Sequence, residues 1–259
     1  MQTRLRIALN FIRQLGFDPT VSLRSVVNFP RYFCNLLAFR KAKKKLPDAS
    51  YALILSPALQ DRRAGAGTSD GHYFWQDLLA AKWVHDFKPK EHLDVGSRID
   101  GFIAHLLSFM EVTLLDIRPL NLSIPGLTVL IDDIMNREGE NQRKFDSVSS
   151  LHSIEHFGLG RYGDPINPIG HVIGLKNLAG KVKPQGQLLI SFPIGNPRIE
   201  FDAQRILAPD FPLKILTDFE LMEFVVIPWK GEPRLGLLPN AVDVHLEGQL
   251  GLYRFKRKG

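Results

Sequence analysis

Short apolar runs alternate with amphipathic stretches from Lys90 to the end of the chain. Each run has the length of a buried strand, and the stretches between them carry apolar residues at helical spacing. This alternation predicts an α/β fold, a doubly wound, mostly parallel sheet of the Rossmann-like type with helices on both faces. The first five predicted strands are EHLDVGS (91–97), EVTLLDIR (111–118), LTVLIDD (127–133), FDSVSSL (145–151) and QLLISFPIG (187–195). Helices are predicted over 99–109 and 171–183, a turn at PQG (184–186), and last strands over 219–228 and 251–258.

The first forty-five residues follow a different pattern. Apolar residues recur at helical spacing over Leu5–Leu15 with arginines between them, and Gly16 and Pro19 are expected to end this helix. A second helical segment is predicted over Val26–Lys45, which ends in the basic cluster RKAKKK. We therefore divide the chain into a basic amphipathic helical arm, residues 1–50, and an α/β domain, residues 51–259.

The composition narrows the class of protein. With 44% hydrophobic and 23% charged residues, the chain is typical of a globular protein and not of a disordered or collagen-like one. The single cysteine, Cys34, excludes an internal disulfide and a cysteine-based zinc site. Arginines interrupt the apolar residues of the first segment, and no run approaches the ~20 residues of a membrane span. A cytoplasmic protein is the prediction.

The charge is distributed unevenly. The arm carries ten basic residues against one acid over residues 1–45, whereas residues 46–247 hold 19 bases and 26 acids. An acidic body argues against a nucleic-acid partner. We expect the apolar face of the arm to pack on the domain or on a second subunit of a homo-oligomer. The alternative is peripheral contact of the arm with an anionic inner-membrane surface. The apolar face includes Leu9, Ile12, Phe33 and Leu37.

Acidic side chains end three successive predicted strands. Gly96 lets the backbone approach a ligand closely beside Asp94, and Asp116 follows about twenty residues later, where an acid binds ribose hydroxyls in nucleotide-binding folds. Asp133 ends the third strand and is placed to accept from an exocyclic amine. A site lined with carboxylates favours a cationic nucleoside over a pyrophosphate. S-adenosylmethionine is therefore predicted in preference to NAD. The dinucleotide-binding fingerprint G-x-G-x-x-G supports this choice, because Arg98 stands where its second glycine belongs.

The segment LHSIEHFGLGRYGDP (151–165) gathers polar side chains directly after the fourth strand. His156 and His152 are candidates for a general base at neutral pH, and Glu155 can orient an imidazole. The rival interpretation is a metal site of His152 and His156 on one helical face, completed by Asp164. HSIEH differs from the HExxH zinc motif, and we expect no metal. Arg161 can pair with a phosphate of the acceptor.

The series DVGS, LLD, IDD, FDSVSSLHSIEH and KPQGQLLISFP resembles the class I S-adenosylmethionine-dependent methyltransferases over roughly residues 70–195. HSIEHFGLGRYGDPINP (152–168) and GTSDGHYFWQDLLAAKWV (67–84) look like an uncharacterised bacterial methyltransferase-like family associated with surface-polysaccharide biosynthesis. Ser97 and Arg98 depart from the usual glycine pattern. The resemblance implies cofactor contacts for Asp94, Gly96, Ser97, Asp116, Asp133, Tyr73, Gln76 and Leu151, and substrate contacts for Arg161, Tyr162 and Asp164.

The implied activity is O-methylation of a sugar, nucleotide-sugar or glycan precursor, with S-adenosylmethionine as cofactor and a histidine as general base. The alternative is a non-catalytic methyltransferase-like module whose arm docks on a membrane or a partner enzyme. Retention of the strand-end acids and of the HSIEH cluster favours the enzyme.

Overall fold

The computed structural model describes Ile12 and residues 16–45, 53–59, 69–120, 123–136, 143–201 and 203–259. The chain divides into two compact units, residues 1–68 and 69–259, eighteen residues beyond the boundary that we expected at residue 50. Within the described part, no helix is long and apolar enough to cross a membrane.

The second unit is built on an eight-stranded sheet in the order β3-β2-β1-β4-β5-β10-β8-β9. Strands β1 to β5 pair in parallel, and β10 runs antiparallel between β5 and β8. This confirms the doubly wound, mostly parallel sheet, and the strand order reverses between β1 and β4. The strands are β1 (His92–Val95), β2 (Val112–Asp116), β3 (Leu127–Ile131), β4 (Phe145–Leu151), β5 (Val182–Ile194), β8 (Phe219–Pro228), β9 (Arg234–Leu235) and β10 (Gln249–Arg257). A separate pair consists of β6 (Arg198–Glu200) and β7 (Gln204–Ile206).

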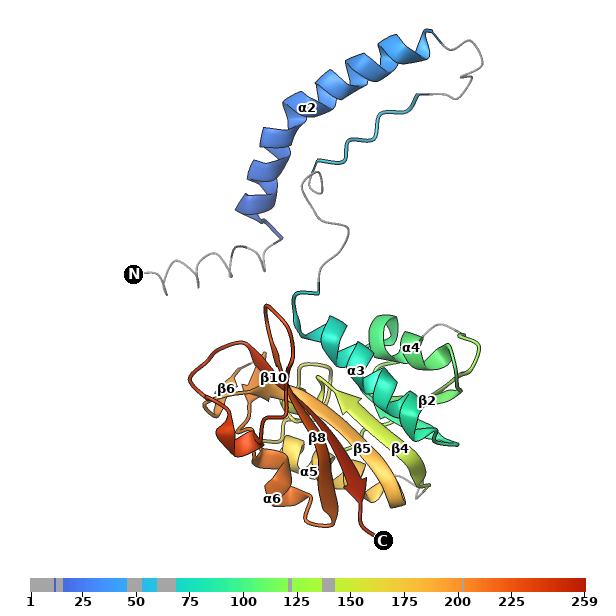
Figure 1. The fold of residues 1–259 in the computed structure, drawn as a ribbon, viewed down its shortest axis with the longest axis vertical. Coiled ribbons are helices and arrows are strands. Elements are labelled where there is room, and N and C mark those ends of the chain that lie inside the picture. Colours follow the sequence, from blue (N-terminus) through green and yellow to red (C-terminus); the bar gives the residue numbers. More distant parts are fainter. Residues whose placement is uncertain are drawn as a thin grey trace. The chain divides into compact units, whose positions relative to one another are not determined.

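Helices cover both faces of the sheet, with α3 and α4 on one side and α5 and α6 on the other (Figure 1). The helices are α3 (His72–Phe87), α4 (Ala104–Leu107), α5 (Gly170–Gly180) and α6 (Phe211–Ile215), with a π-helical turn η1 (Ile99–Ile103) and 3₁₀ turns η2 (Ile154–His156) and η3 (Pro239–Ala241). The predicted helix over 99–109 is confirmed as η1 running into α4.

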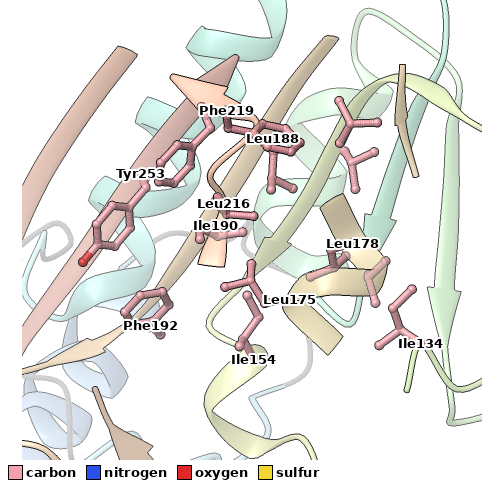
Figure 2. Packing of buried hydrophobic residues seen from close by; sticks show 14 of the residues in the cluster. Ile134, Ile154, Leu175, Leu178, Leu188, Ile190, Phe192, Leu216, Phe219 and Tyr253 are labelled. Carbon is pink, nitrogen blue, oxygen red and sulfur yellow. The ribbon is translucent and has the colours of Figure 1, made fainter. Parts of the chain in front are cut away.

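The core follows from the alternation of side chains along β5. Leu188 and Ile190 face α5 and pack with Leu175 and Leu178, as Figure 2 shows. Leu189 points to the opposite face and belongs to the cluster beneath α3. All five side chains are fully buried, so the sheet separates two apolar layers and presents its strand ends for other uses.

One predicted turn is wrong. The segment PQG lies inside β5, where the pairing register with β4 shifts between Phe145 and Ser147. Gln185 adopts a φ of 62° there, so the extra residues are accommodated as an irregularity within one long strand.

A buried chain of hydrogen bonds crosses the sheet through His92. Gln187 Nε2 donates to Ser147 Oγ at 2.9 Å, and His92 Nδ1 lies 2.8 Å from the same hydroxyl. His92 Nε2 lies 2.9 Å from Ser149 Oγ, which donates to Asp94 Oδ2 at 2.5 Å. Burial lowers the pKa of His92 to about 3 and raises the pKa of Asp94 to about 6. His92 is therefore neutral in the folded protein, and Asp94 is held in a site that disfavours its charge.

Opposite pH dependences follow for these two groups. Unfolding lets His92 take up a proton between pH 3 and 6.5, so its contribution to stability rises with pH. The raised pKa of Asp94 makes its contribution fall as pH rises from 3.8 to 6. We expect His92→Asn to lower the slope of unfolding free energy against pH, between pH 4 and 6, by up to about 1.4 kcal/mol per unit. Urea unfolding at several pH values measures this slope. A slope in His92→Asn equal to that of the wild type would contradict the lowered pKa of His92.

The first unit contains one long helix, α2 (Pro19–Lys43), with a segment over 53–59 described beside it (Figure 1). Asn28 Nδ2 donates to the Leu59 carbonyl at 2.7 Å and ties the two together. The break expected at Gly16 is present as a turn with a φ of 87°. The second helix begins at Pro19, seven residues before the predicted start at Val26, because proline is tolerated in the first turn of a helix. Leu5–Leu15 lies almost wholly outside the described residues.

The proposed apolar face of the arm is solvent-exposed where it is described. Ile12, Phe33 and Leu37 are 36%, 46% and 63% exposed, and Leu9 lies outside the described residues. Packing of this face against the domain, a second subunit or a membrane stays a prediction.

Candidate functional site

A pocket of about 410 Å³ opens where β1 to β4 end. This is the edge at which the strand order reverses, and ligands of doubly wound sheets bind at that edge. The lining includes Tyr73, Gly96, Arg98, Asp116, Arg118, Asp132, Asp133, His152, His156, Arg161, Tyr162 and Asp164.

Gly96 forms the floor of the pocket at the end of β1. Its φ is 73°, and its N–H donates to the Leu115 carbonyl at 3.0 Å. A Cβ at this position would lie 2.4 Å from Ser153 Oγ. Only glycine fits here, and the bare backbone lets a ligand approach the strand end closely.

Asp94 orders the same turn from below. It is fully buried, and Oδ1 accepts from the Ser97 N–H at 3.0 Å, while Oδ2 accepts from the Ser97 hydroxyl at 2.7 Å and from Ser149 at 2.5 Å. Ser97 Oγ in turn accepts from the Leu151 N–H at 3.0 Å. Asp94, Ser97 and Leu151 are absent from the pocket lining. The structure shows them joining β1 to β4, and their contact with a cofactor stays a prediction.

Asp116 lines the pocket at the end of β2, where the sequence placed it, but a neighbour occupies it. Arg118 Nε donates to Oδ1 at 2.9 Å and Nη2 donates to Oδ2 at 2.6 Å. The Arg118 N–H also donates to Oδ1 at 2.8 Å. The Asp116 side chain is 11% exposed and that of Arg118 48% exposed, so the cation is the more solvent-accessible partner of the two.

Asp133 presents a carboxylate oxygen with nothing bound to it. Oδ1 accepts from the Met135 N–H at 2.8 Å, whereas Oδ2 is buried and has no hydrogen-bond partner in the structure. Burial raises the pKa of this carboxyl. A buried acceptor without a donor costs free energy, so Oδ2 is suited to an N–H group supplied by a ligand.

His152 lines the pocket and forms a close pair with Glu155, which is buried behind it. His152 follows β4 with a φ of 53°, an uncommon conformation for a residue with a side chain. Its N–H donates to Ser191 Oγ at 2.9 Å, and its Nδ1 contacts Oε1 of the fully buried Glu155. A carboxylate only accepts, so Nδ1 carries the hydrogen and Nε2 of the neutral ring is free to accept a proton. The ring lines the pocket and stacks on Tyr73 with centroids 5.1 Å apart.

His156 is held differently. Its Nδ1 lies 2.8 Å from the Ala203 carbonyl, and its Nε2 lies 3.8 Å from Glu155 Oε1. Burial lowers the pKa of this imidazole. His156 is thus supported by a backbone carbonyl, whereas His152 has the nearer carboxylate.

The cluster of His152, Glu155 and His156 also has the composition of a metal site. One ligand atom from each residue lies within 4.8 Å of the others, and Glu155 Oε2 is buried without a partner. The predicted third ligand, Asp164, is not part of this group. Its carboxylate instead accepts from the N–H groups of Gly158 and Gly160 at 2.7 and 3.2 Å and shapes the loop over the pocket.

Two further candidates, Tyr73 and Gln76, lie in different environments. Tyr73 lines the pocket, and burial raises the pKa of its hydroxyl. Gln76 is 1% exposed and accepts from the Ser191 hydroxyl at 2.6 Å. Because Ser191 accepts from the His152 N–H, Gln76 supports the backbone of His152, and its contact with a cofactor stays a prediction.

Sequence reasoning missed two arginines. Arg118 follows Asp116 by two residues, so its place at a strand end was a usable signal. Arg205 is 2% exposed and donates to the carbonyls of Glu155 and Phe157 at 3.2 and 2.6 Å. The local sequence around Arg205 does not predict a hydrogen-bond partner such as Glu155, which lies fifty residues away in the chain.

Comparison with known proteins gives similarities of fold. A family model described as "Caenorhabditis protein of unknown function, DUF268" matches residues 124–225, and no curated protein matches the chain. A Burkholderia thailandensis 1,6-didemethyltoxoflavin-N1-methyltransferase with bound S-adenosylhomocysteine is 15% identical, with a TM-score of 0.49 over 71% of this chain and 79% of that one.

Two other solved structures are similar at the same level. The N-methyltransferase NodS from Bradyrhizobium japonicum with S-adenosylhomocysteine is 12% identical, with a TM-score of 0.47 over 74% of this chain and 90% of that one. An S-adenosylmethionine-dependent methyltransferase from Clostridium acetobutylicum is 11% identical, with a TM-score of 0.48 over 86% and 99%. Similarity at this level assigns no reaction to the chain.

Proposed function

We propose that the protein is an S-adenosylmethionine-dependent O-methyltransferase whose acceptor is a sugar, nucleotide-sugar or glycan precursor. The observation that carries this proposal is the set of carboxylate oxygens around the pocket that can accept hydrogen bonds from a ligand. Asp116 and Asp133 end neighbouring strands, and Asp133 Oδ2 is buried without a donor. The residues fit the cofactor, because ribose hydroxyls suit Asp116 and an adenine amine suits Asp133, beside the bare backbone of Gly96.

When bound, the cofactor supplies an electrophilic methyl group. The chain's own contribution is to hold the acceptor hydroxyl and to take its proton. His152 Nε2 is placed for this, because Nδ1 is held by Glu155 and the ring lines the pocket. The buried carboxylate stabilises the imidazolium that forms. The sequence had placed His156 first, and the nearer carboxylate makes His152 our choice.

Asp133 gives the proposal a direct test in binding. We expect Asp133→Ala to weaken S-adenosylhomocysteine binding by about ten- to a hundredfold, since one hydrogen bond to a charged group is lost. Isothermal titration measures the affinity, and Asp86→Ala, an exposed acid at the end of α3, serves as the control. Equal affinities in the two folded variants would show that Asp133 is not in the cofactor site.

The acceptor is identified by activity. Incubation of the full chain with methyl-labelled S-adenosylmethionine and a panel of activated sugars should transfer label to at least one of them. Label transfer only to amines or to protein would contradict O-methylation of a sugar.

A further inference from the structure

Resting on the proposed function, we propose that cofactor binding releases Arg118 from Asp116, and that Arg118 and Arg161, which both contact the Tyr162 ring, then bind a phosphate group of the acceptor. The pocket would thus be a coupled site in which the cofactor's ribose switches on recognition of a phosphorylated acceptor.

The first step rests on competition for one carboxylate. Both oxygens of Asp116 already accept from the Arg118 guanidinium, at 2.9 and 2.6 Å. A ribose diol would bind the same two oxygens and would compete there with the guanidinium, which covers the side of the carboxylate that it contacts with both of its nitrogens. The Arg118 side chain is 48% exposed and that of Asp116 11%, so the guanidinium can move toward solvent when the diol displaces it from the carboxylate. The Arg118 N–H, at 2.8 Å from Oδ1, can remain in place.

The second step rests on what surrounds the released side chain. The Arg118 guanidinium lies 4.6 Å from the centroid of the Tyr162 ring, and that of Arg161 lies 5.3 Å from the same centroid. Both guanidinium groups therefore contact the same aromatic ring at the pocket wall.

Among the described residues that line the pocket, Arg161 is an arginine without a carboxylate partner. Its Nη1 donates to the Ala203 carbonyl at 2.7 Å, and no carboxylate partner is found for it among the described residues. Arg98, by comparison, is paired with Asp100 at 2.6 Å. Asp164, the acid closest in sequence, accepts from three backbone N–H groups and does not neutralise Arg161.

The charge balance explains the coupling. With Arg118 on Asp116, the pocket offers one unpaired guanidinium, which binds an anion weakly. Once ribose hydroxyls replace the guanidinium, two planar donors become available, and paired arginines suit phosphate oxygens bidentately. Linkage requires that the phosphate strengthen cofactor binding by the same factor.

Pyrophosphate and S-adenosylhomocysteine are the probes, with binding to the full chain measured by isothermal titration. We expect saturating S-adenosylhomocysteine to tighten pyrophosphate binding at least tenfold. Arg118→Gln should bind S-adenosylhomocysteine as tightly as the wild type or tighter, and should lose the coupling. Arg161→Gln should weaken pyrophosphate binding at least tenfold and leave S-adenosylhomocysteine affinity unchanged. Arg198→Gln removes a similar exposed pair, with Glu200, outside the pocket, and should change neither affinity.

The outcomes separate this inference from the proposed function. If S-adenosylhomocysteine fails to bind the wild type, both are overturned. If it binds but pyrophosphate affinity is the same with and without it, or Arg118→Gln weakens it, only the switch is overturned. Coupling to acetate and not to pyrophosphate would overturn the assignment of a phosphate.

Discussion

His152→Gln should lower kcat by about 10²–10⁴-fold while leaving S-adenosylhomocysteine affinity nearly unchanged. The expected loss is large because Nε2 of His152 is the proton acceptor that we propose, with Nδ1 fixed by the buried Glu155. Steady-state kinetics with the labelled cofactor and the best acceptor from the panel measure the change.

His156→Gln is the matched control, because this imidazole lines the same pocket but is held by the Ala203 carbonyl. A smaller loss is expected than for His152→Gln. The reverse order would make His156 the base.

Activity should also persist in a chelator. Loss of activity, with recovery on adding Mg²⁺ or Mn²⁺, would show that the cluster of His152, Glu155 and His156 binds a metal instead.

Arg205→Met should cost about 2–5 kcal/mol of unfolding free energy and reduce turnover as well. The Arg205 side chain is 2% exposed, and its four hydrogen bonds reach backbone carbonyls in the segment that carries Glu155. Without the guanidinium, these carbonyls lose a buried donor, although that of Asn167 keeps the Gly170 N–H at 2.9 Å, and the loop over the pocket loses its anchor. Urea unfolding followed by circular dichroism measures the stability.

Two variants sharpen this test. Arg205→Lys keeps the charge but lacks the planar fork, so an intermediate loss is expected. Arg254→Met removes an arginine that pairs with Glu223 on the sheet, away from the pocket, and should leave turnover unchanged. Wild-type stability and turnover in Arg205→Met would show that the loop is held without it.

The apolar pattern was sufficient for the parallel strands because their periodicity is local. Leu188, Leu189 and Ile190 alternate between two covered faces, and a run of this kind has no other stable place in a domain. The arm was predicted less well. The second helix was predicted from Val26 but begins at Pro19, because a proline suits both the end of one helix and the first turn of the next, and local sequence does not separate the two.

The strand-end acids show how far local reasoning reaches for the site. Asp116 ends β2 and Asp133 follows the end of β3 by two residues, and both line the pocket. Their position at the strand ends was therefore enough to predict where they lie. Asp94 ends a strand too, but the hydroxyls of Ser97 and Ser149 occupy its carboxylate. Which acid remains available depends on neighbours from another strand, and a single sequence does not display that pairing.

Equilibrium binding of S-adenosylhomocysteine to the full chain tests the central claim most directly. The methyltransferase account predicts a single site with a Kd below 1 mM (about −4.1 kcal/mol), weakened by Asp133→Ala. Folded wild-type protein that shows no binding at millimolar ligand would contradict it.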